Sequence, residues 1–141
     1  MREFVIDASV AVKWYTTVGE DDLAQADGLL QGYVDGSCQF IAPTLIIYEL
    51  GNALRFNPNF KVAEVRRAIK DFLDLQITLE DSHKILESAV DLAFRHSFTV
   101  YDAAYAALAQ IHGIPMITAD YRFYDRAKEL PFIEALKDLK I

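Results

Sequence analysis

The stretch "FVIDASVAVKWY", residues 4–15, decides the fold of this 141-residue chain. Its β-branched residues Val5 and Ile6 are typical of a strand that is buried on both faces, as the strands of parallel sheets are. A single carboxylate, Asp7, follows where this apolar run ends. A charge at the end of a buried strand must be solvated, paired or bound to a ligand. The role of Asp7 therefore depends on which other residues reach the same place.

Composition indicates one globular domain that covers residues 1–141. Hydrophobic residues make up 52% of the chain and charged residues 25%, which is ordinary for a folded protein. No repeat, low-complexity tract or linker divides it. The single cysteine, Cys38, cannot form an internal disulfide, which fits a reducing compartment, and we expect it to pack in the core.

Charge and hydropathy restrict the functions that the chain can have. The formal net charge of -7 argues against nucleic-acid binding through a broad basic face, but not against a site where metal ions supply the positive charge. Glu3 and Asp7 interrupt the only N-terminal apolar segment, so we expect no signal peptide. The longest uncharged stretch, residues 103–119, is broken by Gly113 and Pro115. We therefore expect a soluble, cytoplasmic protein with no membrane segment.

Strand patterns and helix patterns alternate along the chain. Strands are predicted at residues 3–7, 39–42, 75–81, 114–120 and 132–136, and helices from residue 9 and at 21–34, 44–56, 62–73, 82–96, 99–112 and around 122–126. Strands that are separated by helices predict an α/β fold, a three-layer α/β/α sandwich with a largely parallel central sheet. In such sheets, ligands bind outside the carboxyl ends of the strands.

Four carboxylates point to that edge of the predicted sheet. Asp7 ends the first strand, and Asp120 ends the strand "PMIT" in the same way, so both are expected at one rim. Glu49 and Asp102 lie in unusually apolar helices, "TLIIYELGNAL" and "TVYDAAYAALA". Charges in such surroundings require a partner or a ligand.

Each of these acids also has an ordinary structural interpretation. Asp7 or Asp120 taken alone fits a helix N-cap after a strand. Thr99 and Asp102 fit a capping box, in which the fourth residue bonds back to the cap. Glu49 alone fits a solvated helix residue. The occurrence of four acids in comparable positions favours a shared role, because the other acids mostly lie on polar helix faces.

A shared site of four carboxylates predicts a divalent metal ion. Without a cation the carboxylates would repel one another and their pKa values would rise. Mg²⁺ or Mn²⁺ prefers oxygen ligands and would hold them together. The histidines, His83, His96 and His112, lie apart in the sequence and form no competing cluster. A carboxylate-only site favours phosphoester chemistry, in which metal ions activate a water and stabilise the leaving oxygen.

The motifs "IDASV", "YELGNAL", "TVYDAAYAALA" and "ITAD" together resemble the PIN domain, and among PIN proteins most closely the VapC-type toxins of toxin–antitoxin pairs. The resemblance covers essentially the whole chain. It implies a metal-dependent endoribonuclease that is usually dimeric and is inhibited by a small antitoxin. The family's acidic positions match Asp7, Glu49, Asp102 and Asp120.

The resemblance also implies roles for several residues around the acids. Ser9 matches the small polar residue after the first acid, Asn52 the Asn of the "ExxNAL" segment, and Thr118 the polar residue just before the last acid. Asp125 is a further ligand candidate with a weaker match. Products with a 5′-phosphate and a 3′-hydroxyl are implied in the same way.

Other functions remain open at this point. A phosphoacceptor receiver domain is also a small α/β fold with an acidic pocket, but it needs paired acids after the first strand and a Lys at the end of a late one. A dehalogenase-type phosphatase needs a second Asp where Ser9 stands. A PIN-like fold that has lost catalysis and serves as an interaction module is a third alternative, against which the four intact acids argue.

Candidate contacts with the RNA backbone are Lys13, Arg55 and Arg122, each close in sequence to an acidic motif. Trp14 or Tyr15 is a candidate for base stacking. The alternatives are solvated surface for the cations and core or dimer packing for Trp14.

A helical hairpin, "RFNPNFKVAEVRRAIKDFL" at residues 55–73, is a candidate docking surface for an antitoxin helix. The alternative is that its apolar stripe packs inside the protein. A basic tail on the antitoxin would suit the acidic pocket, because an Arg there relieves the same repulsion as a metal ion.

Overall fold

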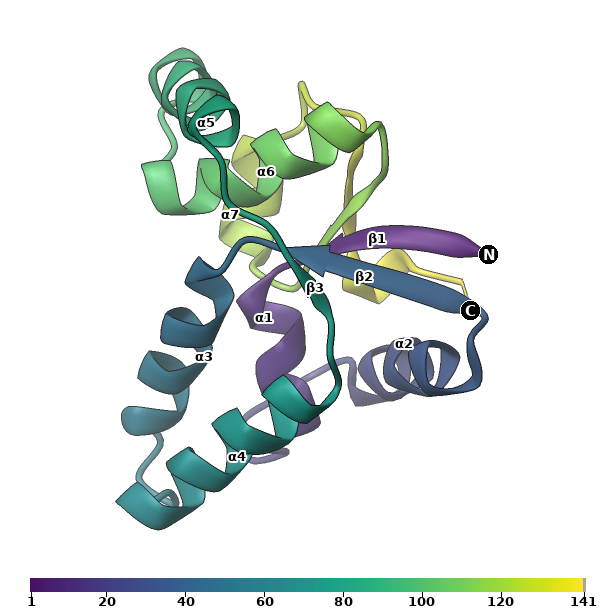
Figure 1. Cartoon of the computed structure of the whole chain (residues 1–141), viewed down its shortest axis with the longest axis vertical. Coiled ribbons are helices and arrows are strands. Elements are labelled where there is room, and N and C mark those ends of the chain that lie inside the picture. The colour runs from purple at the N-terminus through teal and green to yellow at the C-terminus, as the bar shows by residue number, and fades with distance from the viewer. Residues whose placement is uncertain (141) are drawn as a thin grey trace.

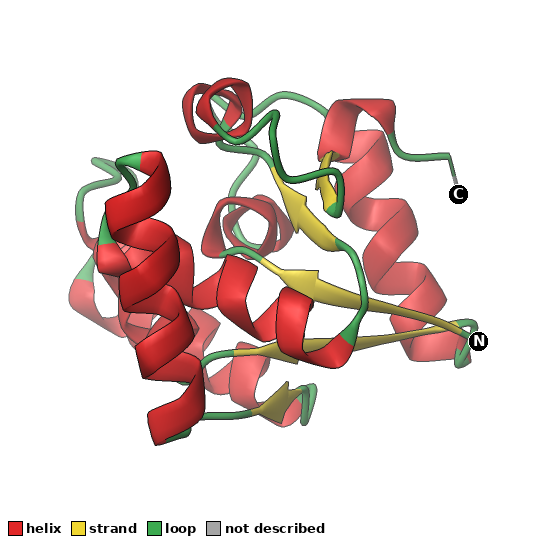
Figure 2. Ribbon diagram, turned by 90° about the horizontal axis from the view of Figure 1, so that it is seen from above, coloured by secondary structure: helices red, strands yellow, loops and turns green. Residues whose placement is uncertain are grey.

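Within the described part of the chain, five parallel strands in the order β3-β2-β1-β4-β5 form a sheet at the centre of the molecule. The structure is a computed structural model and describes residues 1–140. The strands are β1 (Arg2–Ile6), β2 (Cys38–Ala42), β3 (Thr78–Leu79), β4 (Met116–Thr118) and β5 (Ile133–Ala135). In the view from above, they lie side by side among the helices (Figure 2).

Within residues 1–140, seven α-helices connect the strands. They are α1 (Ala8–Ala11), α2 (Leu23–Asp35), α3 (Leu45–Arg55), α4 (Val62–Asp74), α5 (His83–His96), α6 (Val100–His112) and α7 (Tyr121–Arg126), with short 3-10 turns at Val12–Trp14 and Leu136–Asp138. The helices between β1 and β3 lie on one side of the sheet, and α5 and α6 lie on the other (Figure 1). The chain passes from β1 to β2 and β3 in one direction along the sheet, and it then returns past β1 to β4. Because crossovers between parallel strands are right-handed, the helices of the two directions lie on opposite sides of the sheet.

The three-layer α/β/α sandwich with a parallel sheet that the sequence predicts is therefore confirmed. Every predicted strand and helix is present. The predicted strand at residues 75–81 is the most shortened, since only Thr78–Leu79 pairs with β2.

The central position of β1 explains the apolar run with which the chain begins. Phe4 pairs with Phe40 of β2, and Ile6 pairs with Ile117 of β4. Val5 and Ile6 are completely buried, as expected for a strand that is covered on both faces. The first residue that leaves this strand at its carboxyl end is Asp7.

The core also accounts for two predicted packing residues. Trp14 stacks on Phe40 with ring centroids 5.7 Å apart, and its indole N–H donates to the backbone oxygen of Ala26 at 2.9 Å. Trp14 therefore packs inside the fold. Cys38 is buried, as the sequence predicts. Among residues 1–140, no helix combines the length and the hydropathy that a bilayer crossing needs.

Candidate active site

Four carboxylates gather at the carboxyl edge of the sheet. Asp7 follows β1 and Asp120 follows β4, while Glu49 lies in α3 and Asp102 in the first turn of α6. The arrow of β2 points toward α3, and the start of α6 lies on the same side of the molecule as α3 (Figure 1). The acids also interact electrostatically, because Glu49 and Asp102 both raise the pKa of Asp7, and Asp120 raises that of Asp102. The four acids that the sequence singles out thus lie at the same edge of the sheet, and their action as one metal site stays a prediction.

Asp7 is the most deeply buried of the four, with 8% of its surface exposed. It occupies the N-cap position of α1, but its side chain makes no capping hydrogen bond. Its Oδ2 atom instead accepts hydrogen bonds from the hydroxyls of Ser9 at 2.9 Å and Thr118 at 2.7 Å. The capping interpretation of Asp7 is therefore not supported, and Ser9 and Thr118 act as its supporting residues.

Burial raises the pKa of Asp7 to about 6, the two hydroxyls oppose the rise, and the neighbouring carboxylates add to it. Its second oxygen, Oδ1, receives no hydrogen bond from residues 1–140. Every fully buried side-chain oxygen or nitrogen in that range has a hydrogen-bond partner, so Oδ1 is not fully buried. Oδ1 is consequently reached by solvent and is available to a ligand.

The hydroxyls of Ser9 and Thr118 also position the backbone around them. Ser9 Oγ accepts a hydrogen bond from the backbone N–H of Ala119 at 2.9 Å, and Thr118 Oγ1 accepts one from Asp120 at 3.1 Å. Thr118 has no exposed surface. The two hydroxyls therefore join the end of β1 to the end of β4 and fix where both aspartates emerge.

Glu49 is half-buried and is held by a residue that the sequence argument missed. The hydroxyl of Tyr105 donates a hydrogen bond of 2.5 Å to Glu49 Oε1. Burial raises the pKa of Glu49, the Tyr105 hydrogen bond lowers it, and the charge of Asp102 raises it. A signal for Tyr105 exists in the sequence, since it is the one polar-tipped side chain in the apolar run "AAYAALA".

Asp102 and Asp120 both take part in helix caps, Asp102 through its backbone and Asp120 through its side chain. The Thr99 hydroxyl accepts from the backbone N–H of Asp102 at 3.0 Å, so this cap of α6 uses the backbone of Asp102. Burial raises the pKa of the Asp102 carboxyl, and the charge of Asp120 adds to it. Asp120 is an N-cap by its side chain, because Oδ1 accepts from the backbone N–H of Phe123 at 3.1 Å. The capping interpretation is thus correct for one oxygen of Asp120.

The other predicted site residues lie on the surface of the molecule. Asn52 is exposed and follows Glu49 by nearly one turn of α3. Asp125 is exposed on α7, and its nearest cation is Lys128 at 3.9 Å. Arg55 and Arg122 are exposed.

Lys13 points into the fold. It is 7% exposed, and its ammonium donates to Glu20 Oε1 at 3.1 Å and to the backbone oxygen of Asp21 at 2.7 Å. Its charge therefore holds the loop before α2 and is not free to contact RNA.

The donor atoms of the cluster suit Mg²⁺ or Mn²⁺. All four side chains offer carboxylate oxygens. Burial, and after it the charges of neighbouring acids, raises the pKa values of Asp7, Glu49 and Asp102, and a bound cation would stabilise their charged forms. Within residues 1–140, no three His, Cys, Asp or Glu side chains lie close enough together to hold a metal ion by themselves. Mg²⁺ usually keeps several waters and binds proteins through one or two carboxylates, so two neighbouring acids of the cluster would be sufficient to bind it.

Solved structures share this fold over nearly their whole length. A toxin–antitoxin complex from Klebsiella pneumoniae contains a chain that is 16% identical, with 96% of this chain and 98% of that chain covered and a TM-score of 0.70. VapC20 from Mycobacterium tuberculosis, described as a sarcin–ricin loop cleaving toxin, is 15% identical, with coverages of 86% and 94% and a TM-score of 0.65. VapBC2 from Rickettsia felis, bound to a promoter DNA fragment, is 13% identical, with coverages of 94% and 98% and a TM-score of 0.66.

Sequence comparison gives the family. No curated protein matches the chain. The model of the PIN domain matches residues 4–129, a range that includes all four carboxylates of the cluster. This chain therefore belongs to the PIN domain family.

Proposed function

We propose that this chain is a divalent-metal-dependent endoribonuclease and the toxin of a VapBC-type toxin–antitoxin pair. The observation that carries the proposal is the cluster of Asp7, Glu49, Asp102 and Asp120 at the carboxyl edge of the sheet. Family membership and the fold shared with toxins of such pairs support it. A receiver domain is disfavoured, because the observed strand order differs from the 2-1-3-4-5 order of that fold.

The four carboxylates would hold the metal ion, which would activate a water for attack on phosphorus and stabilise the leaving 3′-oxygen. The residues of the chain orient this site. Ser9 and Thr118 fix Asp7 through Oδ2, so that Oδ1 faces the ligand. The cap of α7 fixes Asp120 through Oδ1 and leaves its other oxygen for the site. Because hydrogen bonds already fix the side chains of Asp7 and Asp120, metal binding would require little further ordering of them.

Substrate binding must rely on local contacts, since the chain carries a net charge of -7. Arg55 and Arg122 are exposed near the ends of the helices that carry or follow the acids, and they are proposed to contact the RNA backbone. Single-stranded RNA or exposed loops are the proposed substrates, because such backbones can approach a recessed carboxylate site.

Cleavage of a labelled RNA that contains single-stranded loops tests the proposal. We expect cleavage with Mg²⁺ or Mn²⁺, none in excess EDTA, and none by Asp7→Asn. Asp27→Asn is a matched control, because Asp27 is an exposed acid on α2, and it should cleave like the wild type. Cleavage by Asp7→Asn at the wild-type rate, or by metal-free protein, would show that this site does not perform the reaction.

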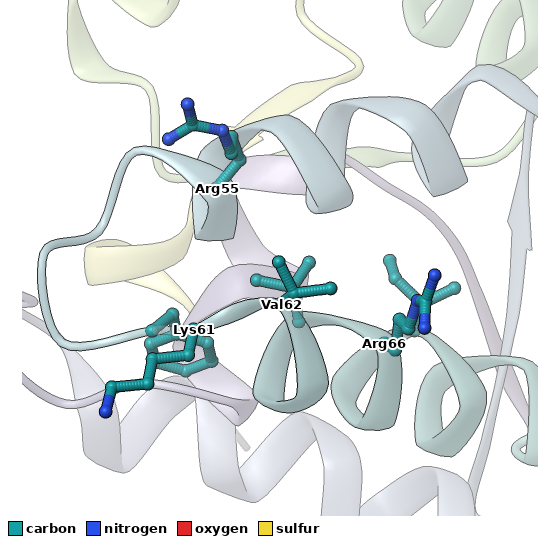
Figure 3. Close-up of a pocket in the computed structure, with 7 residues that line it drawn as sticks. Arg55, Lys61, Val62 and Arg66 are labelled. Atoms are coloured by element: carbon teal, nitrogen blue, oxygen red, sulfur yellow. The ribbon is translucent and has the colours of Figure 1, made fainter.

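A groove in the α3–α4 hairpin supports an antitoxin partner. It has a volume of about 700 Å³ and lies between the end of α3 and the first half of α4. Its apolar lining is Phe60, Val62, Val65 and Ile69, and its cations are Arg55, Lys61 and Arg66. Figure 3 shows Arg55 on one helix and Val62 and Arg66 on the facing one.

On an acidic chain, three cations around an apolar groove favour an amphipathic helix with acidic residues beside its apolar face. The proposed antitoxin therefore has two parts of opposite charge. Its helix would occupy this groove, and its basic tail would place an Arg among the four carboxylates.

A homodimer belongs to the same proposal. Leu86, Val90 and Phe94 follow one another at four-residue spacing along the outer face of α5, and Phe94 is 86% exposed. Such a stripe is typical of a contact surface. Light scattering should give twice the chain mass for the wild type and the single chain mass for Phe94→Ser.

A further inference from the structure

We propose that Tyr105 is a positioning residue that holds the Glu49 carboxylate in its metal-binding orientation. The inference rests on the proposed metal site. It adds a residue that lies outside the carboxylate cluster and to which the sequence motifs assign no role.

A short hydrogen bond directs the Tyr105 hydroxyl. It donates to Glu49 Oε1 at 2.5 Å. A hydroxyl has a single proton to donate, and here that proton is directed at the carboxylate. Through this bond, α6 holds the acid of α3.

The ring of Tyr105 is as constrained as its hydroxyl. Tyr105 has no exposed surface, and its neighbours in α6 are the buried residues Ala106 and Leu108. A side chain packed at interior density keeps one rotamer. The hydrogen bond is therefore anchored to the core, whereas Glu49 itself is only half-buried and lies on a helix surface.

This anchor restricts how Glu49 can bind a metal ion. A glutamate side chain loses considerable rotamer freedom when it is ordered, and Tyr105 imposes that loss before any ligand arrives. The bond occupies Oε1, so Oε2 is the oxygen left for the metal. Hydrogen-bonding partners of metal ligands commonly change metal affinity or activity by about 10–100-fold when removed.

A merely structural tyrosine would behave differently. Tyr33 provides the comparison within this chain, because its hydroxyl donates to the backbone oxygen of Leu75 at 2.6 Å. Its bond has the same chemistry on the donor side but does not involve an acid of the cluster. Loss of either hydroxyl should lower the melting temperature, while only Tyr105 should affect the metal.

Calorimetric titration with Mn²⁺, in the absence of RNA, tests the inference. We expect Tyr105→Phe to weaken Mn²⁺ binding about tenfold or more, and Tyr33→Phe to bind like the wild type. In Glu49→Gln, adding Tyr105→Phe should cause no further loss, because the tyrosine acts through Glu49. Equal Mn²⁺ affinity of Tyr105→Phe and wild type would overturn the inference alone, whereas a wild type that binds no Mn²⁺ would overturn the proposed function as well.

Proton NMR of the wild type gives a measurement that does not depend on the folding of a variant. A buried hydroxyl proton in a bond of this length should resonate far downfield and exchange slowly. We expect it to shift when Mg²⁺ is added. A Tyr105 hydroxyl signal that stays unchanged in Mg²⁺-saturated protein would contradict a positioning role.

Discussion

The hydroxyl of Thr118 donates a hydrogen bond of 2.7 Å to Oδ2 of Asp7, although 111 positions separate the two residues in the sequence. The two residues meet because β1 and β4 are neighbours, with Ile6 opposite Ile117 in the sheet. The residue that orders the acid therefore comes from the adjacent strand. The pairing of β1 with β4 therefore also determines how the Asp7 carboxylate is oriented.

Thr118→Val should weaken both stability and metal binding. The substitution keeps the shape of the side chain but removes a buried hydroxyl that bonds a carboxylate. Hydrogen bonds to charged groups contribute about 1.5–3 kcal/mol, so a loss in this range is expected in urea unfolding at pH 7.5. Mn²⁺ affinity should fall about tenfold. Thr78→Val, at an exposed strand position, is the control and should change neither value.

The pH dependence of stability should depend strongly on Asp7. Burial, the largest cause, raises its pKa from 3.8 to about 6. Between these values the folded state binds more protons than the unfolded state, so the metal-free protein loses stability as the pH rises from about 4 through 6. A shift of about two units corresponds to about 3 kcal/mol. Asp7→Asn lacks this penalty and should show a flatter curve when unfolding is measured from pH 4 to 7.5.

The expected crossing makes this prediction specific. Near pH 4 the wild type and Asp7→Asn should be similar in stability, and at pH 7.5 the metal-free variant should be the more stable protein. Parallel curves for the two proteins over this range would mean that Asp7 has an ordinary pKa in the folded state.

Charge reversal in the hairpin groove should weaken the antitoxin complex. Arg66 lines the groove, and its neighbour Arg67 is exposed but does not line it. We expect Arg66→Glu to reduce the association rate by about tenfold at low salt, and less at high salt, because charges at the rim of an interface mainly act on the encounter. Arg67→Glu has the same change in net charge and should bind nearly like the wild type. Surface plasmon resonance with the proposed antitoxin measures both, and equal losses in the two variants would indicate a general charge effect instead of a docking groove.

Sequence reasoning locates the acids and, through the family resemblance, the two hydroxyls that hold Asp7, but not the residue that holds Glu49. Asp7 and Asp120 each follow an apolar run, and parallel strands end at one edge of a sheet, so local patterns suffice to bring them together. Tyr105 bonds a residue 56 positions away, and no local pattern records which side chain its hydroxyl will meet. For Lys13 the sequence suggests a contact that the structure does not favour. A cation next to an acidic motif suggests a surface contact with RNA, but the fold directs Lys13 inward, where it bonds Glu20. Packing between distant parts of the chain decides the partner of Tyr105 and the position of Lys13, and such packing leaves no periodic pattern in the sequence.

Asp120 shows a further limit of sequence reasoning. From the sequence, helix capping and membership of the metal site are alternative roles for each acid. In the structure, one oxygen of Asp120 caps α7, and the charge of the same side chain adds to the rise that burial causes in the pKa of Asp102. A carboxylate has two oxygens, and a strand end that begins a helix can use one for each purpose.

Asp102→Asn distinguishes a structural from a metal-binding role for the remaining acid. The cap of α6 uses the backbone N–H of Asp102, so the substitution should preserve it. Burial and the charge of Asp120 raise the pKa of Asp102, which means that the metal-free wild type carries a penalty at pH 7.5 that is smaller at pH 5.5. The metal-free variant should therefore melt at the same temperature as the wild type or higher, with the larger difference at pH 7.5.

Saturation with Mn²⁺ should reverse this order. A ligand at about a hundred times its dissociation constant stabilises a protein by about 2.7 kcal/mol, and the variant, with one carboxylate fewer, should gain less. Melting both proteins at pH 5.5 and 7.5, with and without Mn²⁺, therefore gives crossed curves if Asp102 binds the metal. If Asp102 is only a helix residue, Mn²⁺ should raise both melting temperatures equally. Equal shifts together with undiminished RNA cleavage would remove Asp102 from the site and leave Asp7, Glu49 and Asp120 to bind the metal.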